Sequence, residues 1–220
     1  MSYVSIDSGK HQVGYGTKLF LKNGTFERLI QGRIMDEQNL DGFGKEFYNA
    51  ERTVYYIGDW VNGKKWGKGT KVSRTYTYIG DFKNDTMTGF GKITWPKIGY
   101  YVGTFLDNKF DGKGKYVGND GNEYEGLYSK HKRNGDGIEK RANGDVYEGT
   151  WRKNRKVKGK ERKANGDVYD GTWYHKRIGN VEHDKYLTGI LTRTAYNNCI
   201  VKYKSGQMEE DPRYYYCLQN

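Results

Sequence analysis

The chain is dominated by one short pattern, Tyr-x-Gly-x-aromatic, which recurs six times. Successive copies begin 22 or 23 residues apart. A fixed period of this length is typical of a repeat architecture built from small stacked units, and it disfavours a globular enzyme. The six copies consist of Tyr56, Gly58 and Trp60; Tyr78, Gly80 and Phe82; Tyr101, Gly103 and Phe105; Tyr124, Gly126 and Tyr128; Tyr147, Gly149 and Trp151; and Tyr169, Gly171 and Trp173.

Each copy is followed by a polar turn and a second glycine element. In the first four units this element is Gly-x-Gly, as at Gly67 and Gly69, whereas the last two keep only Gly159 and Gly179. Asn-Gly or Asp-Gly pairs at residues 119–122, 143–145 and 165–167 separate later units and favour the positive backbone angles of tight hairpins. The pattern predicts a unit of strand, turn, strand, turn.

Side-chain alternation explains why glycine stands between two rings. Tyr147, Gly149 and Trp151 share one face of a strand, while Glu148 and Thr150 share the other. A glycine between aromatic residues leaves room for a large ring from a neighbouring strand. The row of rings has two interpretations, a groove for a partner or rings that cover their own glycines. We favour the second, because every unit repeats the same rings and a binding site need not be periodic.

At this point the residues resemble a known family. Tyr-x-Gly-x-Trp followed by Asn-Gly-Lys-Lys-x-Gly-x-Gly, over residues 56–69, resembles the MORN repeat. The resemblance and the alternation together predict an all-β fold: an elongated, curved, single-layer antiparallel β-meander of about six clear and two or three degenerate hairpin repeats. The expected organisation is a degenerate N-terminal segment at 1–55, six clear repeats at 56–185, and a degenerate repeat with cap and tail at 186–220.

Eroded copies define these ends. Gly42-Phe43-Gly44 and Gly14-Tyr15-Gly16 are interpreted as second halves of earlier units, and residues 187–191 keep only a central glycine. Eroded units suit the ends of a stack, where a unit has a neighbour on one side only. The Tyr-rich segment 214–216 is expected to fold back as a cap or to dock into another subunit, with the cap favoured. Uncapped end strands also suggest self-association through sheet edges.

The charge distribution suggests a second feature. The chain has a formal net charge of +11, and lysine and arginine gather in the turns between the two strands of the later units. Because equivalent turns stack on one edge of a sheet, these residues are expected to form a basic ladder. The interpretation as a solvated row that protects the edge stays open beside that of an anion-binding edge. The candidate anion-binding residues are Lys130, Lys132, Arg133, Arg152, Lys153, Arg155, Lys156, Lys176 and Arg177.

Catalytic and cofactor chemistry has little support. His131 and His175 fall in equivalent turns without carboxylates or cysteines at metal-ligand spacing, so we expect no metal, no cofactor and no enzymatic activity. Cys199 and Cys217 are isolated, as in a reduced intracellular protein. The ending Cys-Leu-Gln-Asn is a poor prenylation box, and neither a signal peptide nor a transmembrane run is recognised. Nucleic acid is disfavoured because no recognition motif occurs.

The function expected from these observations is a non-catalytic scaffold for protein–protein interaction or assembly. The alternative is a peripheral membrane module that binds anionic phospholipid through the basic sheet edge. The resemblance implies both, since MORN repeats of junctophilins and of plant phosphatidylinositol phosphate kinases are associated with membranes and with protein contacts. It also implies a cytoskeletal or giant-virus particle component, located in the cytoplasm, at a membrane or in a virion.

Overall fold

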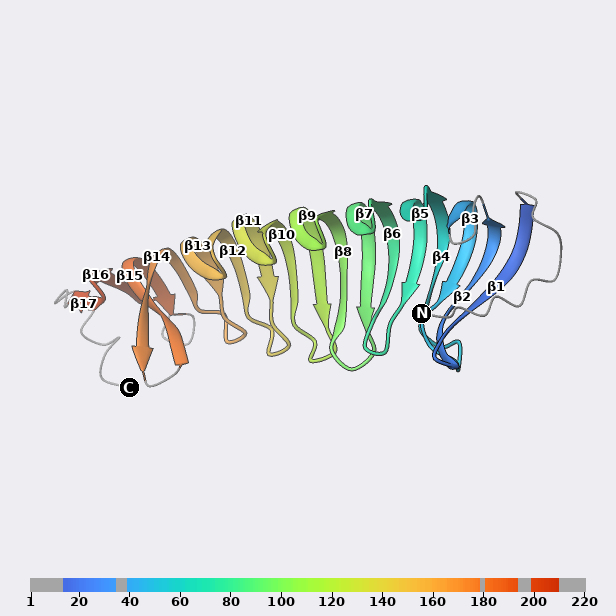
Figure 1. Cartoon of the computed structure of the whole chain (residues 1–220). Coiled ribbons are helices and arrows are strands. Elements are labelled where there is room, and N and C mark those ends of the chain that lie inside the picture. The colour runs from blue at the N-terminus through green and yellow to red at the C-terminus, as the bar shows by residue number, and fades with distance from the viewer. Residues whose placement is uncertain (1–13, 35–38, 179–180, 194–198, 210–220) are drawn as a thin grey trace. The chain divides into compact units, whose positions relative to one another are not determined.

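The computed structural model describes residues 14–34, 39–178, 181–193 and 199–209, and these form antiparallel strands (Figure 1). The chain divides into two units, residues 1–109 and residues 110–220. In each unit, strands that follow one another in the sequence pair with one another, so each unit is a single-layer antiparallel meander, as the sequence predicts. A search of the described residues for a helix long and apolar enough to span a membrane finds none.

Unit 1 holds the N-terminal strands. Its strands are β1 (Gly14–Lys22), β2 (Thr25–Ile34), β3 (Leu40–Phe47), β4 (Tyr55–Val61), β5 (Lys64–Val72), β6 (Thr77–Lys83), β7 (Thr86–Trp95) and β8 (Gly99–Leu106). Unit 2 follows with β9 (Lys109–Gly118), which begins at the boundary, β10 (Glu123–Ser129), β11 (Lys132–Lys140), β12 (Val146–Arg152), β13 (Arg155–Arg162), β14 (Val168–Ile178), β15 (Val181–Arg193), β16 (Cys199–Lys204) and β17 (Gln207–Glu209).

One glycine from each strand pairs with a glycine of the next strand, so that a straight row of glycines crosses each unit. In unit 1 the row consists of Gly16, Gly32, Gly44, Gly58, Gly69, Gly80, Gly91 and Gly103. In unit 2 it consists of Gly114, Gly126, Gly137, Gly149, Gly159, Gly171 and Gly189. The row of unit 2 ends where Gly189 pairs with Tyr203. The eroded units at both ends therefore retain the central glycine.

In the clear repeats a tyrosine ring covers the central pair of glycines, whereas Leu40 lies against the pair Gly32 and Gly44 of the eroded N-terminal unit. A Cβ atom added to Gly69 would lie 2.4 Å from the Tyr56 hydroxyl oxygen, and one added to Gly58 would lie 2.6 Å from the Cα of Gly69. The Tyr56 hydroxyl donates a hydrogen bond to the carbonyl oxygen of Asp59, three residues on, at 3.1 Å. The same bond recurs in the other clear units, from Tyr78, Tyr101, Tyr124, Tyr147 and Tyr169. The packing of rings over glycines, favoured from the sequence, is confirmed.

The rings also join one repeat to the next. Tyr56 makes an edge contact with Trp60 of its own unit and with Phe82 of the following unit, with ring centroids 5.0 and 4.9 Å apart. Tyr147 does the same with Trp151 and Trp173. At the last clear repeat Tyr186 stacks on Tyr169, with centroids 3.8 Å apart. Such ring pairs contribute about 1 kcal/mol each beyond the area that they bury.

The two kinds of turn have different backbone geometry. In the hairpin within a unit, two successive residues have positive φ, as at Asn84 and Asp85 (φ 47° and 67°) or Lys153 and Asn154 (51° and 71°). This is the pattern of a type I′ turn. Between units only the glycine has positive φ, as at Gly144 (92°). The sequence correctly predicts a glycine with positive φ in turns between units such as the one at Gly144. The two-residue type I′ turns, however, lie within the units.

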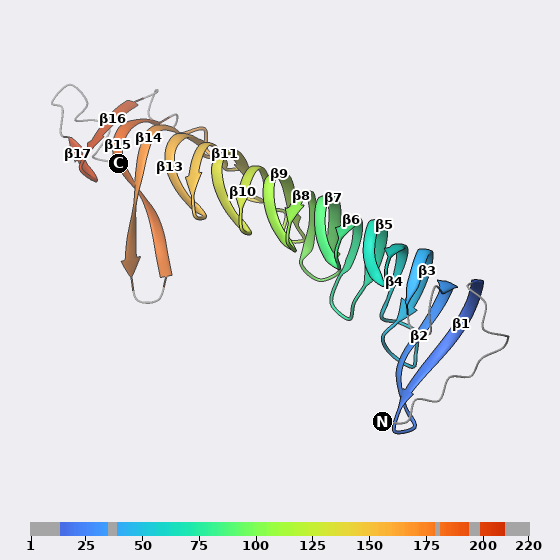
Figure 2. The same cartoon turned by 45° about the horizontal axis from the view of Figure 1, so that its top comes forward.

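The sixth repeat departs from the expected turn. Lys176 and Arg177 are predicted in a turn, but they lie within β14 and pair with His183 and Glu182 of β15. The turn residues alone do not explain this difference, because Lys130 and His131 also lack Asn, Asp and Gly and still form a type I′ turn. The resulting hairpin extends beyond its neighbours in unit 2 (Figure 2). The Tyr-rich segment 214–216 and Cys217 lie outside the described residues.

Candidate binding surfaces

The face that carries the rings is closed. Tyr56, Tyr78, Tyr101 and Tyr124 have exposed fractions of 0%, and the paired rings Trp60 and Phe82 have 4% and 3%. Rings buried to this extent leave no continuous open groove along this face, although the edge of Trp173 contributes to the lining of a pocket described below. Binding surfaces must therefore be sought at the turns and on the opposite face of each unit.

Two of the nine candidate anion-binding residues lie on this closed face. Arg133 pairs directly with Tyr128, and Lys156 with Trp151, so each side chain lies beside the rings. The exposed fraction of Lys156 is 1%. Arg133 forms an ion pair with Glu139, and its guanidinium lies 4.6 Å from the centroid of the Tyr124 ring. Strand alternation turns both side chains toward the rings. The expectation of a solvent-facing cation is wrong for Lys156, which is buried, whereas Arg133 is half-buried and its place in an anion-binding edge stays a prediction.

Lys156 belongs to a buried ionic cluster. Its Nζ donates a hydrogen bond of 2.6 Å to Oε1 of Glu161 and lies 4.6 Å from the centroid of the Tyr147 ring. Burial lowers the pKa of Lys156, and its bond to Glu161 opposes that shift. Burial acts to raise the pKa of Glu161, but the hydrogen bond and charge of Lys156 outweigh it and leave the pKa below its ordinary value. Lys163 and Arg141 also lie within 3.4 and 3.9 Å of the Glu161 carboxylate.

Four of the other candidates gather around one pocket in unit 2, of about 650 Å³. Lys132 reaches it from β11, Arg152 and Lys153 from the end of β12 and its turn, and Arg155 from β13. All four residues are exposed, and Lys156 with Val157 and Trp173 completes the lining. Among the residues whose side chains the structure describes, none in the lining is acidic. We name this the basic pocket, and its charge suits an anionic group.

The remaining candidates are Lys130, Lys176 and Arg177. Lys130 is exposed in the turn between β10 and β11, where its backbone N–H donates to Asp111 at 3.2 Å. Lys176 and Arg177 lie in the long hairpin of β14 and β15. The anion-binding edge as a whole stays a prediction.

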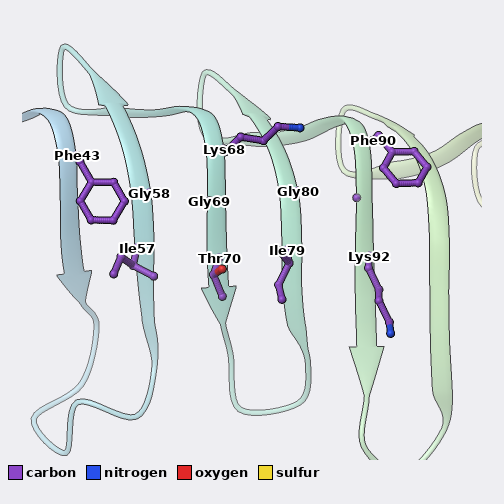
Figure 3. A pocket seen from close by; sticks show the side chains of 11 residues that line it. Phe43, Ile57, Gly58, Lys68, Gly69, Thr70, Ile79, Gly80, Phe90 and Lys92 are labelled. Carbon is purple, nitrogen blue, oxygen red and sulfur yellow. The ribbon is translucent and has the colours of Figure 1, made fainter.

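A second surface, absent from the predictions made from the sequence, lies in unit 1 on the face opposite the rings. A groove of about 500 Å³ follows the glycine row from β3 to β7 (Figure 3). Phe43, Ile79 and Phe90 line it with exposed fractions of 59%, 57% and 58%, and Ile57 lies between them. We name this the apolar groove. Lys68 and Lys92 are the charged residues in its lining.

The equivalent positions of unit 2 are charged. Ile57 and Ile79 precede the row glycines Gly58 and Gly80, whereas Glu125, Glu148 and Asp170 precede Gly126, Gly149 and Gly171. Phe43 and Phe90 likewise correspond to Lys113, Asp136 and Lys158. The fold therefore tolerates charge at these positions, and unit 1 exposes apolar side chains there without a structural need. The sequence contains this signal, in the variable residue that precedes each row glycine.

The arrangement defines a class of protein. It consists of β-hairpin repeats in which a tyrosine ring covers a pair of glycines, and the residues on the face opposite the rings vary from repeat to repeat. The chain belongs to the MORN repeat family, whose model matches residues 56–77, 78–97, 101–123, 124–146 and 147–168. No curated protein matches the chain. The copy that begins at Tyr169 lies beyond the matched residues, but it keeps the buried ring, the hydroxyl bond and the glycine pair.

Membership of the family makes this an interaction module in the broad sense. MORN repeats form a non-enzymatic repeat family, and they are generally involved in protein–protein or membrane and phospholipid interactions. Among the described residues, no group of three or more His, Cys, Asp or Glu side chains could hold a metal ion.

Proposed function

We propose that the chain is a non-catalytic scaffold that binds other proteins, and that the apolar groove of unit 1 is the surface that holds them. The supporting observation is that unit 1 exposes three large apolar side chains at positions where unit 2 carries charge. Exposed apolar residues gathered in one groove, with no role in the fold, are typical of protein interaction sites. We further propose that the chain takes part in a larger intracellular assembly, such as the cytoskeleton or a virus particle.

Cross-linking from the groove tests the scaffold. A photo-reactive amino acid at Thr70, in the groove lining, should capture a defined protein in cells that express the full chain. The same amino acid at Thr150, exposed on the outer face of unit 2, is the matched control. Capture from both positions alike, or from neither, would contradict the proposal.

The basic pocket supports a second candidate function, the binding of an anionic phospholipid headgroup. Four exposed cations around one pocket, with Val157 and Trp173 beside them, suit a phosphate group next to acyl carbon. The role would place the protein at a membrane surface.

Vesicle co-sedimentation tests this candidate. The variant Arg152→Glu, Lys153→Glu, Arg155→Glu should lose binding to anionic vesicles at near-physiological salt, while neutral vesicles bind neither protein. The matched control Lys64→Glu, Lys97→Glu, Lys109→Glu makes the same change in net charge at exposed positions outside the pocket. Equal loss in both variants would mean that net charge alone attracts the protein to the vesicle.

A further inference from the structure

We propose that the buried rings of unit 2 contain a redox site, in which Trp173 loses an electron to an anionic one-electron oxidant and Tyr186 holds the resulting radical. The oxidant is of the class of the carbonate radical anion. This activity is independent of the scaffold function and of phospholipid binding. Three observations carry it: the rings contact one another in series, Trp173 reaches the basic pocket, and Tyr186 is hydrogen-bonded to a carboxylate.

The rings of unit 2 form a continuous series of contacts. The centroid of the Tyr147 ring lies 5.0 Å from that of Trp151 and 4.9 Å from that of Trp173. The Tyr169 ring lies 4.9 Å from Trp173 and is stacked on Tyr186 at 3.8 Å. Trp173 and Tyr186 also contact one another directly, at 6.4 Å. Because the π orbitals of rings in contact overlap, an electron lost from one ring of the series is readily replaced from another.

Trp173 gives an oxidant access to this series from the basic pocket. It has an exposed fraction of 6% and lines the pocket together with the cations Arg152, Lys153 and Arg155. Cations that converge on a pocket raise the local concentration of anions, and the effect weakens as salt rises. An anionic oxidant is therefore drawn to the place where the edge of Trp173 is open to it.

Tyr186 has a partner for the proton that a phenol releases on oxidation. Its hydroxyl donates a hydrogen bond of 3.3 Å to Oε2 of Glu161, whereas the Tyr169 hydroxyl donates to the backbone carbonyl oxygen of Thr172. An oxidised phenol is a strong acid, and a carboxylate takes its proton where a backbone carbonyl does not. A phenol that releases its proton to a base is also easier to oxidise than an indole. The radical therefore moves from Trp173 to Tyr186.

The two steps balance in electrons and protons. Trp173 gives one electron to the carbonate radical anion, which becomes a carbonate ion, and Trp173 becomes a radical cation. Tyr186 then gives one electron to Trp173 and its hydroxyl proton to Glu161. The products are a neutral Trp173, a neutral Tyr186 radical and a protonated Glu161, and no bond between heavy atoms forms or breaks. The ion pairs of Glu161 with Lys156 and Lys163 hold it in the ionised form before the step, as a proton acceptor requires.

Pulse radiolysis of the full chain, with the carbonate radical anion as the oxidant, tests the site. The background Cys199→Ser, Cys217→Ser removes the two thiols, which compete for the radical. We expect the absorption of the tryptophanyl radical to decay as that of the tyrosyl radical rises. The transfer should be slower in heavy water, because a proton moves with the electron, and equal rates in light and heavy water would overturn the inference. A nitroso spin trap and peptide mass spectrometry then locate the radicals, with an adduct expected at Tyr186.

A phenylalanine variant tests the role of the Tyr186 hydroxyl. Tyr186→Phe keeps a ring against Tyr169 but has no proton to release, so adducts at Trp173 should increase relative to those at Trp66, which is 38% exposed in unit 1. The matched control is Tyr203→Phe, because the Tyr203 ring also contacts Tyr186 and Tyr169, at 5.3 and 6.0 Å. It should leave the ratio of adducts unchanged. An unchanged ratio in Tyr186→Phe, or an equal rise in both variants, would contradict the site.

The charge of the oxidant tests the entry through the basic pocket. The variant Arg152→Glu, Lys153→Glu, Arg155→Glu should lower the adducts at Trp173 relative to those at Trp66 when the oxidant is the carbonate radical anion. The azide radical is neutral, and with it the same variant should match the wild-type protein. If the variant and the wild-type protein gave the same ratio with the carbonate radical anion, the pocket would not deliver the oxidant and the inference would fail.

Discussion

At the scale of single residues, Gly-x-Gly combines two different requirements. Gly67 and Gly89 have φ of 62° and 66°, a conformation that L-residues rarely adopt. Gly69 and Gly91 have no such φ, but they lie against the Tyr56 and Tyr78 rings. One glycine of the element thus serves the backbone and the other serves the packing.

The packing role predicts a large effect from one methyl group. Gly69→Ala places Cβ within 2.6 Å of three atoms of the Tyr56 ring and hydroxyl, so we expect a loss of about 3 kcal/mol in the free energy of unfolding. Gly16→Ala, in the same row, meets Ile34 Cδ1 at 3.7 Å and nothing else among the described residues within 4 Å, and it should change stability little. Urea denaturation measures both variants, and equal losses would mean that the ring does not set the cost.

The buried ion pair predicts a different result. Met87 and Ile93 occupy the positions in the second repeat that Lys156 and Glu161 occupy in the fifth, since they pair with Phe82 and Tyr78 as the ions pair with Trp151 and Tyr147. Lys156→Met alone removes the shortest ion pair of a buried carboxylate, which then keeps the longer contacts with Lys163 and Arg141, and it should cost about 3 kcal/mol. Lys156→Met with Glu161→Ile should recover stability to wild type or above it. A double-mutant cycle of unfolding free energies checks the coupling, and strict additivity would refute it.

At the scale of elements, each hairpin is tied to the next through its turn. The second residue of the turn exchanges hydrogen bonds with the preceding hairpin: Asn154 accepts from the N–H of Arg133 at 2.7 Å, and its own N–H donates to the Arg133 carbonyl at 3.0 Å. Asn108 makes the same pair of bonds with Met87. In the fourth clear repeat His131 replaces the asparagine, and its Nδ1 accepts from the N–H of Phe110 at 3.3 Å. His131 therefore has a structural role in its turn.

One residue of a type I′ turn, Lys153, is expected to have opposite effects on the stability of the protein and on its binding to anionic vesicles. Lys153 has φ 51° in its turn, a conformation that asparagine tolerates better. We expect Lys153→Asn to raise the free energy of unfolding by about 0.5–1 kcal/mol and to weaken anionic-vesicle binding, because it removes a cation of the basic pocket. Denaturation and co-sedimentation measure the two effects. The control Lys64→Asn lies in a strand and should not raise the free energy of unfolding. If Lys153→Asn lowered the free energy of unfolding, lysine would not be strained in the turn.

At the scale of the whole molecule, the tyrosines give the protein a common dependence on pH. Burial raises the pKa of Tyr124 to about 12, above the ordinary 10.0. Burial likewise raises the pKa values of Tyr56, Tyr78 and Tyr186. The folded state favours the protonated, neutral tyrosine. The contribution of these tyrosines to the free energy of unfolding is therefore fully present at pH values below their ordinary pKa.

That contribution should disappear at high pH. A group whose pKa is raised in the folded state loses its stabilising effect as pH rises through the raised value. We therefore expect stability to change little on account of these tyrosines up to about pH 10 and to fall steeply from there to about pH 12. Tyrosinate absorbance and circular dichroism, followed together, check this. Ionisation of the repeat tyrosines near their ordinary pKa with the sheet intact would contradict it.

The sequence by itself determined the repeat, the strand order within each unit and the packing of rings over glycines. These follow from local rules, because the period, the alternation of faces and the turn residues involve neighbours along the chain. Tertiary structure alone decided which cations face solvent. Lys156 and Lys153 look alike in the sequence, yet pairing with Trp151 buries one and a type I′ turn exposes the other. The apolar groove likewise exists only when β3 to β7 lie side by side, because Phe43, Ile57, Ile79 and Phe90 stand far apart in the chain.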